Sequence, residues 1–433
     1  MIKRKIGFKI VAMICSLTLT FTLLWGCGAK GKQIDFARIN DDGELVLYYT
    51  DGTEENLGLV NGEDGADGLM GERGDVGSTG PAGKDGTDGV ITVENNDNGI
   101  ALAASKGLQS AVSITCEFTV RTGYYMSTAT SAGSGVIYTL DKAKGDALII
   151  TNYHVVYNSS STASNKISND ISVFLYGSEY DSQGIAAEYV GGSMNYDIAV
   201  LSISDSSALK SADVAAVTVA NSEDVYVGDT AIAIGNPEGM GISASSGVVN
   251  VDSEYITMTA PDETTQVTFR VMRVDAAVNS GNSGGGLYNS SGELIGIVNA
   301  KVSTTDVENI GYAIPSNLAV AVADNIIDNF TLKEISLGFT PSITDSHAEY
   351  DVSTGYISIV EEIQVSAVSG SGLFRSYVQA GDIIVSVSTN EKSVEVTRKH
   401  HLTEFMLELR LGDTVTLKFL RDGIEETATV TVS

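Results

Sequence analysis

Short apolar runs dominate residues 97–331, and clusters of Gly, Asn, Asp and Ser separate them. Many short β-branched strands at this spacing predict an all-β barrel or sandwich. A helical pattern, SNLAVAVADNIIDNF, follows and is expected to close this domain. Residues 333–433 read as a second, α+β unit, with mixed strands and one helical stretch around HHLTEFMLELRL. The expected fold class is therefore mainly β, with two domains after residue 96.

The first 26 residues have the pattern of an export signal. A basic start, MIKRKIGFK, precedes an apolar run from Ile10 to Trp25. A membrane-spanning helix needs about 20 apolar residues, so the run is short for one. It ends in Leu-Leu-Trp-Gly-Cys, which resembles the lipobox of bacterial lipoproteins. That resemblance implies cleavage before Cys27, a diacylglycerol on its sulfur and a place on the outer face of the cell membrane. A plain signal peptide is the alternative.

Two further segments precede the globular part. Residues 27–61 alternate apolar and polar positions around two Asp-Gly turns, which predicts a small β segment. In residues 62–89 every third residue is glycine, the period of the collagen triple helix. Only Pro81 adds stiffness there, so a flexible acidic spacer is an equal alternative. A triple helix would require three chains.

Charge and cysteine content narrow the function classes. The formal net charge is -29, which argues against a nucleic-acid partner. Of three cysteines, only Cys116 lies in the globular part, so no disulfide can form within it and the core must supply stability. No motif indicates a metal site or a cofactor.

Three motifs carry candidate chemistry. His154, one of four histidines in the chain, follows an apolar strand in TNYHVV and is expected at the strand end. Asp197 begins the apolar run DIAVL, where a buried carboxylate needs a partner. Ser283 lies in NSGNSGGG, whose glycines let the backbone turn its N–H groups inward.

Together these residues satisfy the logic of a catalytic triad. A serine becomes nucleophilic when a base takes its proton, and an acid fixes the tautomer of that base. The backbone N–H groups of Gly281 and Ser283 would form the oxyanion hole. The G-x-S-x-G spacing also fits the nucleophile elbow of α/β-hydrolases, but that motif needs a helix after the serine. The Gly-Gly-Gly and Asn-Ser-Ser-Gly that follow predict a hairpin, so we reject the elbow.

TNYHVV, YDIAVL and GNSGGG resemble the catalytic motifs of the HtrA/Deg family of serine proteases. The resemblance covers roughly residues 100–330. It implies a chymotrypsin-like double β-barrel, a homotrimer and ATP-independent cleavage of unfolded or misfolded exported proteins. Residues 333–433 resemble a PDZ domain more loosely. That likeness implies binding of peptide C-termini at Leu337, Gly338 and Phe339.

The substrate pocket and one rival function complete the expectations. Ala277 is expected at the pocket base and is neutral, which disfavours a preference for Lys or Arg. Ala300 and Lys301 are expected on the pocket strand, and the direction of Lys301 stays open. The rival is a surface binding or chaperone protein that keeps the protease fold without depending on cleavage.

Overall fold

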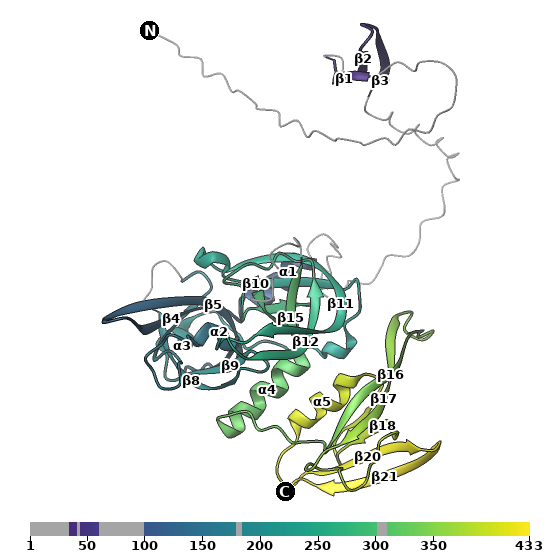
Figure 1. Ribbon diagram of the computed structural model, residues 1–433. Helices are drawn as coiled ribbons and strands as arrows, with labels where there is room; N and C mark the ends of the chain where they lie inside the picture. The colour runs from purple at the N-terminus through teal and green to yellow at the C-terminus, as the bar shows by residue number, and fades with distance from the viewer. Residues whose placement is uncertain (1–33, 41–43, 60–98, 179–183, 301–309) are drawn as a thin grey trace, which may run out of the picture. The chain divides into compact units, whose positions relative to one another are not determined.

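A computed structural model describes residues 34–40, 44–59, 99–178, 184–300 and 310–433 (Figure 1). The chain divides into two compact units, Met1–Val90 and Ile91–Ser433. The described part of the first is an antiparallel sheet in the order β1-β2-β3 (Ile34–Ile39, Glu44–Tyr49, Glu54–Leu59). The predicted signal, Cys27 and the glycine repeat of residues 62–89 lie outside the described residues.

The second unit opens with a closed six-stranded barrel. Its strand order is β4-β5-β6-β9-β8-β7. Alternate residues of the first strand, Val112, Ile114, Cys116 and Phe118, point into the barrel and are at most 2% exposed. The strands are β4 (Ala111–Thr122), β5 (Tyr125–Asp141), β6 (Asp146–Thr151), β7 (Asp170–Leu175), β8 (Ile185–Ser193) and β9 (Ile198–Ile203).

A second closed barrel follows, in the order β10-β11-β12-β15-β14-β13. Its strands are β10 (Thr230–Gly235), β11 (Ser243–Thr259), β12 (Gln266–Val274), β13 (Gly286–Tyr288), β14 (Leu294–Val298) and β15 (Gly311–Pro315). Strands β13 and β14 pair antiparallel directly after Ser283, as the predicted hairpin requires. The two barrels confirm the expected double-barrel fold.

Helices and short turns connect the strands. The predicted closing helix is α4 (Ser316–Asn329), which contacts β8 and β9 of the first barrel and β14 of the second. It ends at Phe330, whose φ of 61° is left-handed. The other segments are α1 (Gly99–Leu108), α2 (Tyr153–Val156), α3 (Ser207–Ser211), η2 (Ser222–Asp224) and η3 (Pro237–Gly239). Among the described residues, no helix combines the length and apolar character that crossing a membrane requires.

The C-terminal domain is one sheet with one helix beside it (Figure 1). The sheet order is β16-β17-β18-β20-β21, and β19 pairs with β18. Helix α5 (Lys399–Glu408) packs Leu402 and Phe405 into the domain core. The strands are β16 (Phe339–Tyr350), β17 (Ile357–Val368), β18 (Ile383–Ser388), β19 (Ser393–Glu395), β20 (Thr414–Arg421) and β21 (Ile424–Thr431). The result is the mixed α+β unit that the sequence predicts.

Candidate active site

His154, Asp197 and Ser283 come from three separate segments that meet where the barrels join. His154 lies on α2, Asp197 immediately precedes β9, and Ser283 lies in the loop before β13. The sequence places His154 at a strand end, but the structure puts it in a short helical turn after β6. The Ser283 carbonyl accepts a hydrogen bond of 2.8 Å from the Ser134 N–H on β5, which ties the loop to the first barrel.

The Asp197 carboxylate holds the His154 ring. Its side chain is 1% exposed, and its Oδ2 lies 2.6 Å from His154 Nδ1. Its Oδ1 accepts the backbone N–H of His154 at 2.9 Å, and Oδ2 also accepts Asn299 Nδ2 at 2.9 Å. Because both oxygens are occupied by donors, the buried charge is compensated and the ring is fixed with Nε2 facing away from the acid.

Backbone conformation at Asp197 sets up this contact. Its φ of 52° is left-handed, a region that Asp and Asn enter more readily than most residues. The carbonyl of Asp197 accepts the Tyr153 N–H at 3.1 Å and Asn152 Nδ2 at 2.9 Å. Asp197 therefore bonds to all three residues of the Asn152-Tyr153-His154 segment.

Glycines shape the loop that carries Ser283. Gly281 has a φ of 94°, and a Cβ there would lie 2.3 Å from the Asn236 carbonyl oxygen. Gly284 has a φ of 85°, and its Cβ would lie 2.2 Å from the Ser134 carbonyl oxygen. A side chain at either position would push the loop off the strands beneath it.

The loop leaves two backbone donors free. The Ser280 carbonyl accepts the Glu238 N–H at 2.8 Å. Because C=O and N–H point in opposite directions across a trans peptide, this bond turns the Gly281 N–H away from Glu238. Within the described residues, neither the Gly281 nor the Ser283 N–H donates a hydrogen bond. This pair is available to a developing oxyanion.

Two of the three expected pocket residues lie beside the loop that carries Ser283. Ser283 Oγ accepts the Ala300 N–H at 3.2 Å, and no hydrogen bond joins it to the His154 ring among the described residues. The Ala277 carbonyl accepts Asn282 Nδ2 at 3.4 Å, and the Ala277 side chain is exposed. Ala277 and Ala300 thus flank the serine loop. Lys301 lies outside the described residues.

The C-terminal loop predicted to bind peptides is tightly built. Leu337 and Phe339 are buried in the core of the domain. Gly338 has a φ of 88°, and its N–H donates to Ser336 Oγ at 3.3 Å. Its carbonyl accepts the Ser369 N–H at 2.9 Å. Leu337 and Phe339 therefore support this loop from below, and peptide binding by the loop stays a prediction.

Sequence reasoning missed two polar residues that position the site. Asn299 directly precedes the expected pocket residue Ala300, and its side chain donates to Asp197. Ser134 Oγ accepts the Asn236 N–H at 2.8 Å and donates to the Gly281 carbonyl at 2.7 Å. Nothing local in the sequence links Asn299 to an acid 102 residues away. Ser134 lies in the Gly-Ser-Gly of β5, and no local sequence pattern links it to Gly281 either.

A double β-barrel with a buried Asp, a His and a glycine-flanked Ser at the barrel junction defines the class of trypsin-like serine peptidases. A family model described as "Trypsin-like peptidase domain" matches residues 133–297. The solved structure of an "HtrA-type protease AlgW with tripeptide" covers 76% of this chain and 95% of its own, at 25% identity and a TM-score of 0.50.

Two bacterial relatives are more similar in sequence. "Serine protease Do-like HtrA" of Bacillus subtilis (strain 168) is 33% identical over 309 residues, which span 69% of this chain and 63% of the relative. The protein of the same name from Lactococcus lactis subsp. lactis (strain IL1403) is 34% identical over 314 residues, 70% of this chain and 71% of the relative. The chain belongs to the HtrA family of serine proteases.

Proposed function

We propose that this chain is an ATP-independent serine endopeptidase that cleaves unfolded or misfolded exported polypeptides. The observation that carries the proposal is the 2.6 Å contact between His154 Nδ1 and the buried Asp197, beside a glycine-flanked Ser283. A buried acid bonded to one ring nitrogen leaves the other nitrogen as a base. A fold kept only for binding has no use for such an arrangement.

In this mechanism Ser283 Oγ attacks the substrate carbonyl carbon and His154 Nε2 takes the serine proton. The Gly281 and Ser283 N–H groups stabilise the resulting oxyanion, a donor pair worth about 3 kcal/mol for each member. His154 then gives its proton to the leaving amine, and water hydrolyses the acyl-enzyme by the reverse sequence. For this, Ser283 Oγ must leave the Ala300 N–H and rotate to the His154 ring.

Ser283→Ala tests the assignment. We expect casein cleavage to fall by several powers of ten while the circular dichroism spectrum stays that of the wild type. A fluorophosphonate should label the wild-type chain at Ser283 and leave the variant unlabelled. If the wild type is not labelled, or the variant keeps activity within a few-fold, the rival binding or chaperone function is favoured.

The C-terminal domain is proposed to bind peptides with free C-termini. Strand β16 is an edge of its sheet, so an extended peptide can add to it as a further strand. The AlgW relative carries a tripeptide in its solved structure. A peptide array that compares free and amidated C-termini tests the idea, and equal binding of both forms would contradict it.

The site of action is proposed to be the extracytoplasmic face of the cell membrane, with a lipid on Cys27. A Cys27→Ser chain lacks the sulfur that carries the lipid. Because stable anchoring needs two or more acyl chains, it should leave the membrane fraction.

A homotrimer is proposed from the family resemblance and from the glycine repeat. Light scattering on chains with and without residues 62–89 measures it, and a monomer in both would rule out the trimer.

A further inference from the structure

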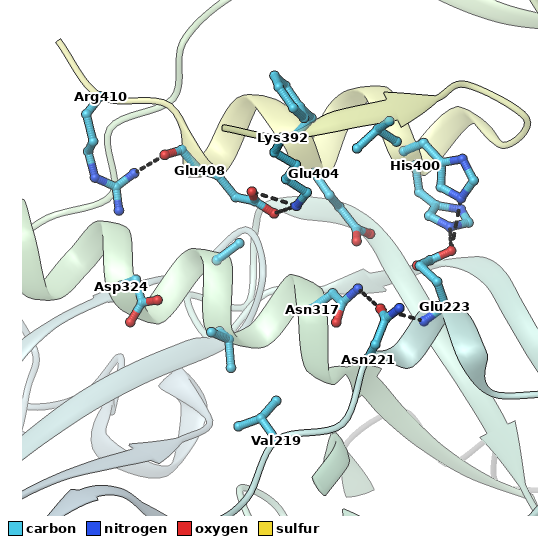
Figure 2. Close-up of a pocket in the computed structure, with 15 residues that line it drawn as sticks. Val219, Asn221, Glu223, Asn317, Asp324, Lys392, His400, Glu404, Glu408 and Arg410 are labelled. Carbon is cyan, nitrogen blue, oxygen red and sulfur yellow. Dashed lines mark hydrogen bonds and ion pairs between the residues drawn. The ribbon is translucent and has the colours of Figure 1, made fainter. Parts of the chain in front are cut away.

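A cavity lies between the C-terminal helix α5 and the protease domain. Its volume is about 630 Å³, and its lining comes from η2 and α4 on one side and α5 on the other. Figure 2 shows Glu223 at one end of this cavity, with the His400 side chain directed toward it. This cluster, which includes the neighbouring His401, plays no part in the proposed proteolysis.

Three ligand-type atoms converge there. His400 Nε2 lies 2.9 Å and His401 Nε2 lies 3.0 Å from the same oxygen, Oε2 of Glu223. The two rings meet edge to face with centroids 4.7 Å apart. All three atoms lie within 4.8 Å of one another. Two histidines that are adjacent in sequence therefore point their outer nitrogens at one carboxylate from the other domain.

The hydrogen bond on the far side of His401 fixes the tautomer of its neutral ring. His401 Nδ1 lies 3.0 Å from the Glu395 carbonyl oxygen, which can only accept, so Nδ1 carries the hydrogen. A neutral ring then turns the lone pair of Nε2 toward the carboxylate of Glu223. Two acceptors at this separation repel unless a cation lies between them. An N–H bonded to a carbonyl is also the usual support of a metal-bound histidine.

His400 is suited to the same role. Its side chain is 3% exposed. Its Nε2 lies 2.9 Å from Glu223 Oε2, so this nitrogen and that oxygen can share one metal ion.

We propose that Glu223, His400 and His401 bind a zinc ion that links the protease domain to the C-terminal domain. Two imidazole nitrogens and one carboxylate oxygen form a donor set that Zn²⁺ prefers, and water from the cavity supplies a fourth ligand. Tetrahedral bonds of about 2.0–2.1 Å need donors about 3.3 Å apart, close to the 2.9 and 3.0 Å between the two nitrogens and Glu223 Oε2.

The nearby positive charges are already paired. Arg270, 3% exposed, makes two hydrogen bonds to Glu404, of 2.6 and 2.8 Å, and its Nη2 lies 3.1 Å from the other oxygen of Glu223. Across the cavity Lys392 lies 2.7 Å from Glu408. The contact between Glu223 Oε1 and Arg270 leaves Oε2 facing the two histidines.

Zinc titration of the full chain tests the site, with a chromophoric chelator as competitor and Zn²⁺ alone as the probe. We expect one ion per chain and a rise in Tm of several degrees at saturating zinc, because binding to the native state stabilises it. His401→Gln should weaken binding at least 10-fold and make the Tm shift smaller than in the wild type at the same zinc concentration. His347→Gln is the matched control, an exposed histidine with Nδ1 3.1 Å from Asp345.

Glu223→Gln provides an independent test from the protease side. It should also weaken zinc binding at least 10-fold, as measured at 25 °C on protein shown to be folded by circular dichroism. If this variant does not fold, the comparison of His401→Gln with His347→Gln still decides. Unchanged zinc binding in His401→Gln, or no zinc-dependent Tm shift in the wild type, would overturn the proposal.

Discussion

Asn299 offers the sharpest test of how the active site is held together. Its side chain is buried and donates to Asp197 Oδ2 at 2.9 Å, on the oxygen that also holds His154. Replacing it with leucine keeps the approximate size but removes this donor from a buried carboxylate. Hydrogen bonds to charged groups contribute about 1.5–3 kcal/mol, which corresponds to a loss of about 10- to 100-fold in rate.

The assay is hydrolysis of a quenched fluorescent peptide, with kcat and KM determined separately across pH. Because Asn299 is 1% exposed and acts through Asp197, kcat should fall while KM stays within about two-fold. A merely structural role would not separate kcat from KM in this way.

Asn289→Ala is the matched control. The Asn289 side chain is an amide in the same barrel, but it donates to Glu293 at 2.9 Å instead of to Asp197. Its kinetics should equal those of the wild type. If Asn299→Leu is folded and retains more than half of the wild-type kcat at every pH, the argument that Asn299 supports the triad is wrong.

Three further predictions concern other parts of the chain. Glu404→Gln leaves the buried Arg270 with the Glu223 carboxylate as its partner, so urea unfolding should show a loss of about 3 kcal/mol. Lys392→Ala removes one member of an exposed ion pair and should cost under about 1 kcal/mol. Equal losses in the two variants would contradict the burial argument. Gly281→Ala should lower kcat about 100-fold or more without unfolding, because its Cβ would lie 2.3 Å from the Asn236 carbonyl oxygen; unchanged kcat would remove Gly281 from the oxyanion hole. Burial, then the charge of Asp170, raises the pKa of Cys116 to about 12, so a thiol reagent at pH 8 should modify it only after denaturation; rapid modification of the native chain would refute this.

Local patterns were enough to predict the fold class and to select His154, Asp197 and Ser283 as triad candidates. Apolar alternation in segments such as SAVSITCEFTV marks strands whose inward side chains form a barrel core. The glycines around Ser283 predict a turn, and the polar Asn-Ser-Ser-Gly after them predicts the β13–β14 hairpin. His154 follows β6 in the short helix α2, where the Asp197 carbonyl accepts the neighbouring Tyr153 N–H.

Contacts between distant segments were not predictable in the same way. The bond from Asn299 to Asp197 spans 102 positions, and those from Arg270 to Glu404 and from His400 to Glu223 span 134 and 177. No spacing rule connects such residues, because their distance is set by how barrels and domains pack. Two adjacent histidines do not by themselves indicate a metal site. They do so only once the fold places a carboxylate of another domain opposite them.

The sequence nevertheless shows that Asp197 and Arg270 each need a polar partner. Asp197 begins an apolar run, and Arg270 lies inside the apolar strand VTFRVMRV. A charge in such a run is buried when the strand packs, and a buried charge without a partner costs several kcal/mol. Each therefore demands a polar partner from elsewhere in the chain. The sequence shows where such partners are required, and the fold determines that Asn299 and His154 serve one charge and Glu404 and Glu223 the other.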